Sequence, residues 1–297
     1  MSKNKPRIAF CFSWQARTLD QTYIFFQKNL FDAAKEQWFD YDVFCAVEDD
    51  EDVDKVKLLN PTKIKKIKSS DVEEFINIKY PDYIKEFLEN YCLTDLNILP
   101  NTLNQFYKVQ ESILLMDKYW KQNKISWDIV VKLRFDFLFF NKLNYCNILK
   151  IVINNNIICN KHNTPKYLIK FWEINDFFFF GNYHSMVLLW SIFDDFVTLK
   201  FLKKIKSIYK PFFYFFGVIK KFFIYINNLL KHWILPVWLI RLFESIFYEI
   251  YTPELIYYQY FIYHKIPVLK RNFSYMLIRK QVEKSIIRLE QKNEFEL

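Results

Sequence analysis

Two short apolar segments on either side of an amphipathic segment open the chain, and this alternation is what most constrains its fold. Arg7 to Phe12 and Tyr41 to Val47 have the length and composition of buried strands. Between them, Leu19 to Glu36 carries apolar residues at helical spacing. Two strands joined through a helix are typical of the βαβ unit, in which the strands run parallel. The sequence therefore predicts an α/β fold with a mostly parallel central sheet flanked by helices.

Further elements are expected downstream, and they continue the same alternation. They are a strand at Thr62 to Ile67, helical stretches within Asp71 to Tyr91, a helix that begins at a capping box of Thr102 and Gln105, strands at Ile148 to Cys159 and Ile174 to Phe180, a helix from Thr252 to His264, and an extended segment from Val268 to Ile278. Gly181 follows four phenylalanines. We expect it to mark either a turn with positive φ or a close packing contact.

Glycine and cysteine usage excludes several classes of site. The chain has only 2 glycines, so it cannot form the glycine-rich phosphate loops of P-loop or dinucleotide-binding proteins. The 5 cysteines are scattered and show no metal-ligand spacing. We expect reduced, buried thiols in a cytosolic setting. Met1 to Arg7 is polar and has no signal-peptide core.

The segment from Trp127 to Phe140 contains the most informative charged pair. Its apolar run ends in Arg134-Phe135-Asp136, and alternate strand residues share a face. A charged pair at the end of a buried strand is costly unless something uses it. Ligands of α/β sheets bind at the carboxyl ends of the strands. Arg134 and Asp136 therefore indicate either a site for a charged ligand or a structural ion pair.

The order of several short motifs resembles a group of glycosyltransferases that act in bacterial surface-polysaccharide synthesis, such as that of capsule and lipopolysaccharide. The motifs are Gln15 and Arg17 after the first strand, Tyr41-Asp42-Val43-Phe44, the Pro61 segment, Gln105-Phe106-Tyr107 at a helix start, Trp127-Asp128, Arg134-x-Asp136, Asn175-Asp176 before Gly181, and Pro253-Glu254. The resemblance covers roughly residues 7–198 and 250–279. It implies a GT-A-like, nucleotide-diphospho-sugar transferase fold.

Two positions depart from the pattern of that family. Trp14 stands where the family usually has a glycine. Arg134-x-Asp136 stands where many GT-A enzymes carry Asp-x-Asp. One carboxylate therefore remains at that motif for a divalent cation.

The resemblance also implies roles for six residues. Gln15, Arg17, Arg134 and Asp136 would bind the donor, and Asp136 would also be a ligand of Mn²⁺ or Mg²⁺. Asp176 and Glu254 would be catalytic residues that act on the acceptor. Each has a structural alternative. Arg17 could be a solvated loop residue, Asp176 a turn or cap residue, and Glu254 a first-turn acid that suits the helix dipole. The acidic run Glu48 to Asp52 could hold the ribose or uracil, or could simply be solvated.

Positive charge gathers in one segment near residues 199–249. Between Leu199 and Ser245, nine lysines and arginines lie against Glu244 alone, interleaved with phenylalanine, tyrosine and tryptophan. Its longest uncharged runs are too short to span a bilayer. Lysine on a narrow stripe opposite a broad aromatic face suits a helix lying on an anionic membrane surface. A helical hairpin packed on the catalytic domain is the alternative. No nucleic-acid-binding motif accompanies the charge, so we expect no nucleic-acid partner.

These patterns lead to one prediction of organisation and function. Residues 1–198 and 250–279 would form a GT-A-like catalytic domain, 199–249 a basic helical insertion, and 280–297 a charged helical tail. The chain would be an enzyme that transfers a sugar from a nucleotide-sugar donor to a glycan or lipid-linked acceptor. It would work in the cytoplasm at the inner face of the membrane. The competing interpretation is a non-enzymatic, membrane-associated binding or scaffold protein on a degenerate transferase fold.

Overall fold

A computed structural model describes residues 5–79, 98–154, 157–161, 174–197, 260–261, 264–271 and 275–277. The predicted insertion at 199–249, the predicted tail at 280–297 and Glu254 lie outside the described residues. The proposed domain boundaries therefore stay predictions.

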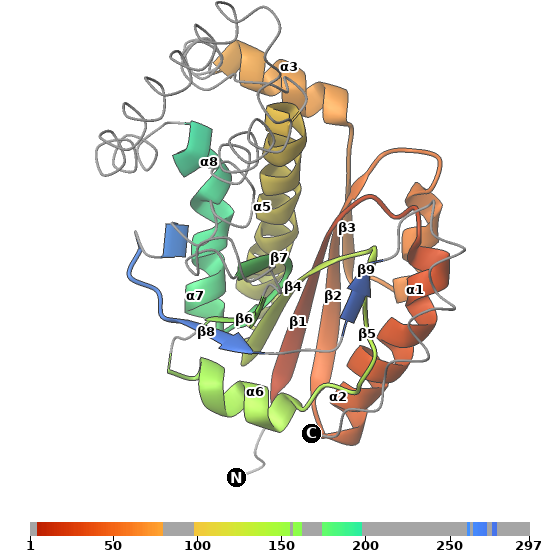
Figure 1. The fold of residues 1–297 in the computed structure, drawn as a ribbon, viewed down its shortest axis with the longest axis vertical. Coiled ribbons are helices and arrows are strands. Elements are labelled where there is room, and N and C mark those ends of the chain that lie inside the picture. Colours follow the sequence, from red (N-terminus) through yellow and green to blue (C-terminus); the bar gives the residue numbers. More distant parts are fainter. Residues whose placement is uncertain are drawn as a thin grey trace, which may run out of the picture.

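A seven-stranded sheet forms the centre of the described structure (Figure 1). Its order is β3 (Lys63–Ile67), β2 (Asp40–Glu48), β1 (Arg7–Trp14), β4 (Ile129–Arg134), β7 (Ile174–Gly181), β6 (Ile157–Lys161) and β8 (Val268–Arg271). The strands β3, β2, β1 and β4 are mutually parallel, and β6 is parallel to β8. Only β7 pairs antiparallel with its neighbours β4 and β6. The predicted α/β class with a mostly parallel sheet is confirmed.

Helices cover both faces of this sheet (Figure 1). One face is covered by α1 (Leu19–Phe26), the π-helix η1 (Gln27–Asp32) and α2 (Ala33–Glu36), and the other by α5 (Ile98–Asn123), α7 (Tyr183–Val187), η3 (Leu188–Ser191) and α8 (Ile192–Val197). The remaining described elements are η2 (Val53–Leu59), α3 (Ser69–Lys79), α6 (Tyr145–Val152) and a separate antiparallel pair of β5 (Phe137–Phe139) with β9 (Tyr275–Leu277).

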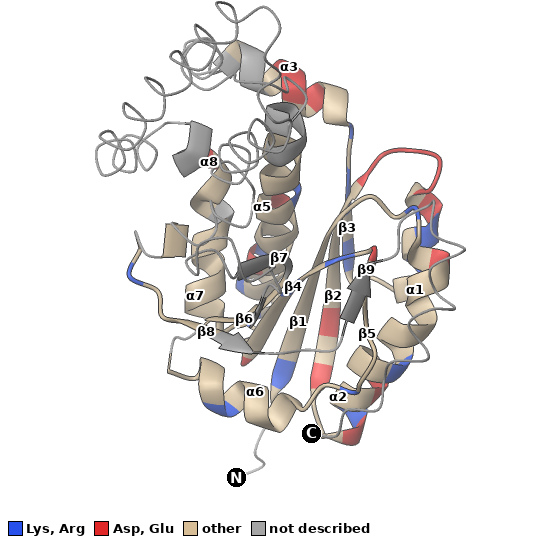
Figure 2. Ribbon diagram, in the orientation of Figure 1, with Lys and Arg blue, Asp and Glu red and all other residues tan. Residues whose placement is uncertain are grey.

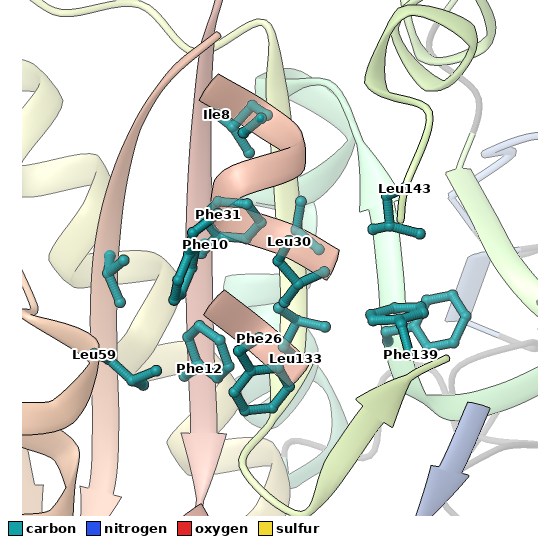
Figure 3. Packing of buried hydrophobic residues seen from close by; sticks show 14 of the residues in the cluster. Ile8, Phe10, Phe12, Phe26, Leu30, Phe31, Leu59, Leu133, Phe139 and Leu143 are labelled. Atoms are coloured by element: carbon teal, nitrogen blue, oxygen red, sulfur yellow. The ribbon is translucent and has the colours of Figure 1, made fainter. Parts of the chain in front are cut away.

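Strand alternation divides the buried side chains into two cores. Along β1, Phe10 and Phe12 join Phe26 and Leu30 on the α1 face, as Figure 3 shows, while Cys11 belongs to the α5 face. Each fully buried side chain of this size contributes about 1.5–3 kcal/mol through removal from water. The two cores therefore fix which side chains of β1 face α1 and which face α5.

Two sequence predictions about elements are wrong. The segment Ile148 to Cys159 is not one strand, because α6 ends at Val152 and β6 begins at Ile157. The side chain of Asn144 caps α6 by accepting a hydrogen bond from the backbone N–H of Asn147 at 3.0 Å. Tyr145, Ile148 and Val152 then bury one helical face.

The predicted capping box does not begin a helix. The long helix α5 already begins at Ile98, so Thr102 and Gln105 lie inside it. Pro100 stands in its first turn, where the missing backbone N–H of proline costs no helical hydrogen bond.

Gly181 marks a close packing contact, which is one of the two predicted alternatives. No glycine among the described residues has positive φ. A Cβ at Gly181 would lie 2.7 Å from Cγ of Met186. The buried thiols are confirmed for Cys11 and Cys45, whereas Cys146 is exposed.

Candidate functional site

The carboxyl ends of three adjacent parallel strands meet at one edge of the sheet. Trp14 at the end of β1 is in register with Val47 of β2, and Ser13 is in register with Arg134 at the end of β4. Glu48, the last residue of β2, follows Val47. This is the edge at which α/β sheets place their ligands. The acidic loop that follows β2 leaves from the same edge (Figure 2).

Arg134 and Asp136 form a bidentate ion pair at this edge. Nε of Arg134 donates to Oδ1 of Asp136 at 2.9 Å, and Nη2 donates to Oδ2 at 2.7 Å. The strand ends at Arg134 and Asp136 lies in the following turn, so the expectation that both stand on one strand face is wrong. The turn nevertheless brings the two groups together, and their side chains are only 14% and 15% exposed.

The turn itself is anchored by its middle residue. Phe135 is fully buried and stacks on Phe12, with ring centroids 5.5 Å apart. The hydroxyl of Thr22 on α1 donates to the backbone carbonyl of Phe135 at 2.7 Å. The backbone beneath the Arg134–Asp136 pair is therefore held on both sides, which favours a defined position for the pair.

Trp14 lies between this pair and a second charged cluster. The guanidinium carbon of Arg134 lies 5.2 Å from the centroid of the indole, and Nζ of Lys108 lies 5.3 Å from it. Both distances are within the range of cation–π attraction. The backbone of Trp14 has φ 110°, a conformation that side-chain-bearing residues rarely adopt. The position where the resembling family usually has glycine is thus one where glycine would be unstrained.

The second cluster consists of Glu48, Lys108 and Ser69. Lys108 on α5 is 2% exposed and donates to Glu48. The backbone N–H and the hydroxyl of Ser69 also donate to Glu48, at 2.9 and 2.7 Å. Burial alone would raise the pKa of Glu48, but Lys108 and Ser69 outweigh it and lower that pKa. Burial lowers the pKa of Lys108, and Glu48 opposes that shift.

Sequence reasoning missed Lys108 and treated Glu48 as part of a solvated or ribose-binding run. Glu48 is buried and both its carboxylate oxygens accept hydrogen bonds from protein groups. A signal for Lys108 was present, because Gln105, Lys108 and Ser112 form a polar stripe at helical spacing, and all three are buried. A buried polar stripe requires partners. Lys108 finds Glu48 at the end of β2, and the hydroxyl of Ser112 donates to the backbone carbonyl of Val109 in the same helix at 2.9 Å.

Gln15 and Arg17 lie in the loop after β1, next to Trp14. Nζ of Lys55 donates to the backbone carbonyl of Arg17 at 2.9 Å and also pairs with Asp20 and Asp52. This lysine holds the loop to η2. The Arg17 side chain is exposed and forms no ion pair within the described part of the chain. Its guanidinium therefore points to no protein carboxylate there and is accessible at this edge.

Asp176 belongs to β7, whose backbone begins beside the end of β4. Leu133 is in register with Phe178, and the two strands are antiparallel, so Asp176 comes level with the turn that follows Arg134. The fold thus brings the backbone of Asp176 to the edge that holds the Arg134–Asp136 pair. The other predicted acceptor residue, Glu254, lies outside the described residues.

Two acidic residues of the motifs that resemble the glycosyltransferase family lie at the opposite, amino-terminal end of the strands. Asp42 near the start of β2 accepts hydrogen bonds from Nη2 of Arg7 at 2.7 Å and from the hydroxyl of Thr62 at 3.0 Å. Asp128 accepts from the backbone N–H of Arg7 at 2.8 Å. Both carboxylates are engaged in joining strands to one another, so their role in the motifs is structural.

The described residues offer limited ligands for a cation and no membrane span. In them, no group of three or more histidine, cysteine, aspartate or glutamate side chains could hold a metal. Asp136 alone could be one ligand of Mg²⁺ or Mn²⁺, with phosphate oxygens and water completing the shell, which is a common arrangement for Mg²⁺. None of the helices in these ranges is both long and apolar enough to cross a bilayer.

Comparisons with known proteins give a loose structural match. No protein-family model matches the sequence, and no curated protein matches it. Solved structures that match include mouse xyloside xylosyltransferase 1 in its apo form, at 11% identity and a TM-score of 0.38. The match covers 67% of this chain and 75% of that chain. At that TM-score the similarity carries no argument about function.

Proposed function

We propose that the chain is a glycosyltransferase that moves a sugar from a nucleotide-sugar donor to a glycan or lipid-linked acceptor in surface-polysaccharide synthesis. The observation that supports this most is the bidentate Arg134–Asp136 pair at the carboxyl edge of a mostly parallel sheet. The loop of Gln15 and Arg17 leaves from the same edge. The resemblance of the motifs, which include all four of these residues, supplies the reaction class.

Arg134 would bind the diphosphate of the donor. Its planar guanidinium makes two parallel hydrogen bonds to Asp136 through Nε and Nη2, and phosphate oxygens would accept from its further N–H groups, those of Nη1 included. The exposed side chain of Arg17 would add a second positive charge, and Gln15 would add an amide. When the bond between the anomeric carbon and the diphosphate oxygen breaks, the nucleoside diphosphate leaves with additional negative charge. Guanidinium groups held in place there would stabilise that charge.

Asp176 and Glu254 would act on the acceptor side. One carboxylate would accept the proton of the acceptor hydroxyl as its oxygen attacks the anomeric carbon. The backbone of Asp176 lies level with the Arg134–Asp136 turn, which supports a role for this residue near the proposed leaving group. If Mn²⁺ or Mg²⁺ takes part, Asp136 would hold it, and the cation would supply further positive charge at the diphosphate.

The basic segment at 199–249 would hold the enzyme on an anionic membrane surface, at the cytoplasmic face where a lipid-linked acceptor would be presented. Its support is compositional, since nine basic residues alternate there with aromatic ones. The same segment would serve the competing function, a membrane-associated scaffold with no catalytic activity.

A thermal-shift panel tests the proposed function. UDP, GDP and CMP would be added with and without Mn²⁺, and one of them should raise the unfolding midpoint, because a ligand that binds only the folded state stabilises it. Arg134→Lys keeps the charge but loses the fork. It should weaken binding by about 1.5–3 kcal/mol, which is roughly 10- to 100-fold.

The matched control is Lys142→Ala, which breaks an exposed ion pair with Glu36 and should leave binding unchanged. Binding of none of the nucleotides, or equal binding by wild type and Arg134→Lys, would rule out the donor site and favour the scaffold.

A further inference from the structure

Trp14 combines an unusual backbone with an unusual position. It is the last residue of β1, and its φ of 110° is far from the values that strand residues with a side chain adopt. A strained, non-glycine residue persists only where its surroundings hold it, and such residues gather at functional sites. The side chain of Trp14 must therefore contribute something that glycine at the same position would not.

The contacts of the indole show what that contribution is. Arg134 and Lys108 both place their charge over the ring, at 5.2 and 5.3 Å from its centroid. Each cation is also paired with a carboxylate, Asp136 for Arg134 and Glu48 for Lys108. Because β1 lies between β2 and β4, the indole is the part that joins the charged groups at the ends of those two strands.

We propose that Trp14 is a positioning residue that holds the Arg134 guanidinium in place for the donor diphosphate, a role that rests on the proposed function. An arginine side chain has many rotamers, and fixing it before a ligand arrives lowers the entropy lost on binding. The indole face restricts Arg134 on one side, and Asp136 orients its fork. The strained backbone is retained because it aims the ring at Arg134.

Trp38 provides a matched control within the same chain. It also has positive φ, 66°, and a cation over its ring, since Nζ of Lys5 lies 5.0 Å from the centroid. However, Trp38 is 72% exposed and lies just before β2, at the amino-terminal end of the strands. Replacing it changes a tryptophan that also has positive φ and a cation over its ring, without touching the carboxyl edge.

The test compares Trp14→Gly, Trp14→Phe and Trp38→Gly with the wild type by two measurements. The first is the rate at which phenylglyoxal modifies Arg134, followed by peptide mass spectrometry. The second is the Kd for UDP or whichever diphosphate stabilises the wild type most, measured by calorimetry well below the unfolding midpoint of every variant. In Trp14→Gly, phenylglyoxal should modify Arg134 several-fold faster than in the wild type, and the diphosphate should bind at least about tenfold more weakly. Trp14→Phe keeps an aromatic face and should lie between, and Trp38→Gly should match the wild type.

Each outcome decides the proposal. An unchanged modification rate at Arg134 in Trp14→Gly overturns it, and so does a faster rate with an unchanged Kd. If the wild type binds no nucleoside diphosphate, the proposed function fails, while the modification rate still decides whether Trp14 positions Arg134. If Trp14→Gly does not fold, as judged by circular dichroism, Trp14→Phe decides. If Trp14→Phe then shows the same modification rate at Arg134 or the same Kd as the wild type, the indole ring does not position Arg134 better than a phenyl ring does, and the proposal is overturned.

Discussion

Lys108 is a cation that the fold holds almost completely out of water. It is 2% exposed and paired with Glu48, which is 8% exposed. Breaking such a pair is costly because the remaining charge stays buried without compensation. We expect Glu48→Gln to lower the free energy of unfolding by about 3–5 kcal/mol in urea titrations. The double variant Glu48→Gln with Lys108→Met should recover part of that loss, and a double variant that is additive would contradict a direct pairing.

The same pair predicts a dependence of stability on pH. The pKa of Glu48 is lowered by folding from its ordinary value of 4.5, so the unfolded chain binds a proton more readily than the folded one. The stabilisation is therefore complete above pH 4.5 and is lost as the pH falls through the lower pKa of the folded state. In Glu48→Gln this part of the acid dependence should be missing from unfolding curves recorded between neutral and acidic pH. An identical acid dependence in both proteins would speak against the lowered pKa.

At the scale of elements, the end of β7 is pressed against α7. A Cβ on Gly181 would come within 2.7 Å of Cγ and 3.0 Å of Sδ of Met186, and Met186 is itself fully buried. We expect Gly181→Ala to destabilise the fold by about 1–3 kcal/mol through overpacking, measured by thermal unfolding. Since φ at Gly181 is not positive, the backbone itself accepts alanine. Adding Met186→Ala should make the two changes less costly together than their sum, whereas strict additivity would place the conflict elsewhere.

At the scale of the whole molecule, positive charge is distributed unevenly along the chain. The net charge is +9, and nine basic residues lie within 199–249. If that segment lies on anionic lipid, each lysine near the surface contributes about 1 kcal/mol. In a further variant, Lys203, Lys204, Lys220 and Lys221 are all changed to glutamate. This variant should bind vesicles of anionic lipid roughly 1,000-fold more weakly than the wild type, measured by flotation.

The control for that measurement carries the same change in net charge on the described body, with glutamate at four exposed positions, Lys63, Lys68, Lys118 and Lys150. It should float nearly as well as the wild type. Equal loss by both variants would mean that overall charge, and not the segment, governs association, and equal flotation by all three would remove the membrane from the proposed function.

Much of the fold was predictable from local pattern, and the failures have physical causes. Runs of apolar residues and helical spacing identified β1, β2, β3 and β7, because burial on one or both faces leaves a period in the sequence. The segment at 148–159 was mistaken for one strand because short apolar runs suit a buried helix equally well. The start of α5 was placed one turn late because an internal Thr102-x-x-Gln105 mimics a cap.

For the site, the sequence by itself determined that Arg134 and Asp136 belong together, because two residues so close along the chain need little tertiary information to meet. Only the tertiary structure decided that Trp14 lies between Arg134 and Lys108, and that Lys108 reaches Glu48, 60 residues away. Such contacts depend on strand order and register, which bring distant residues to one edge. Neither order nor register is encoded in the periodicity of any single segment.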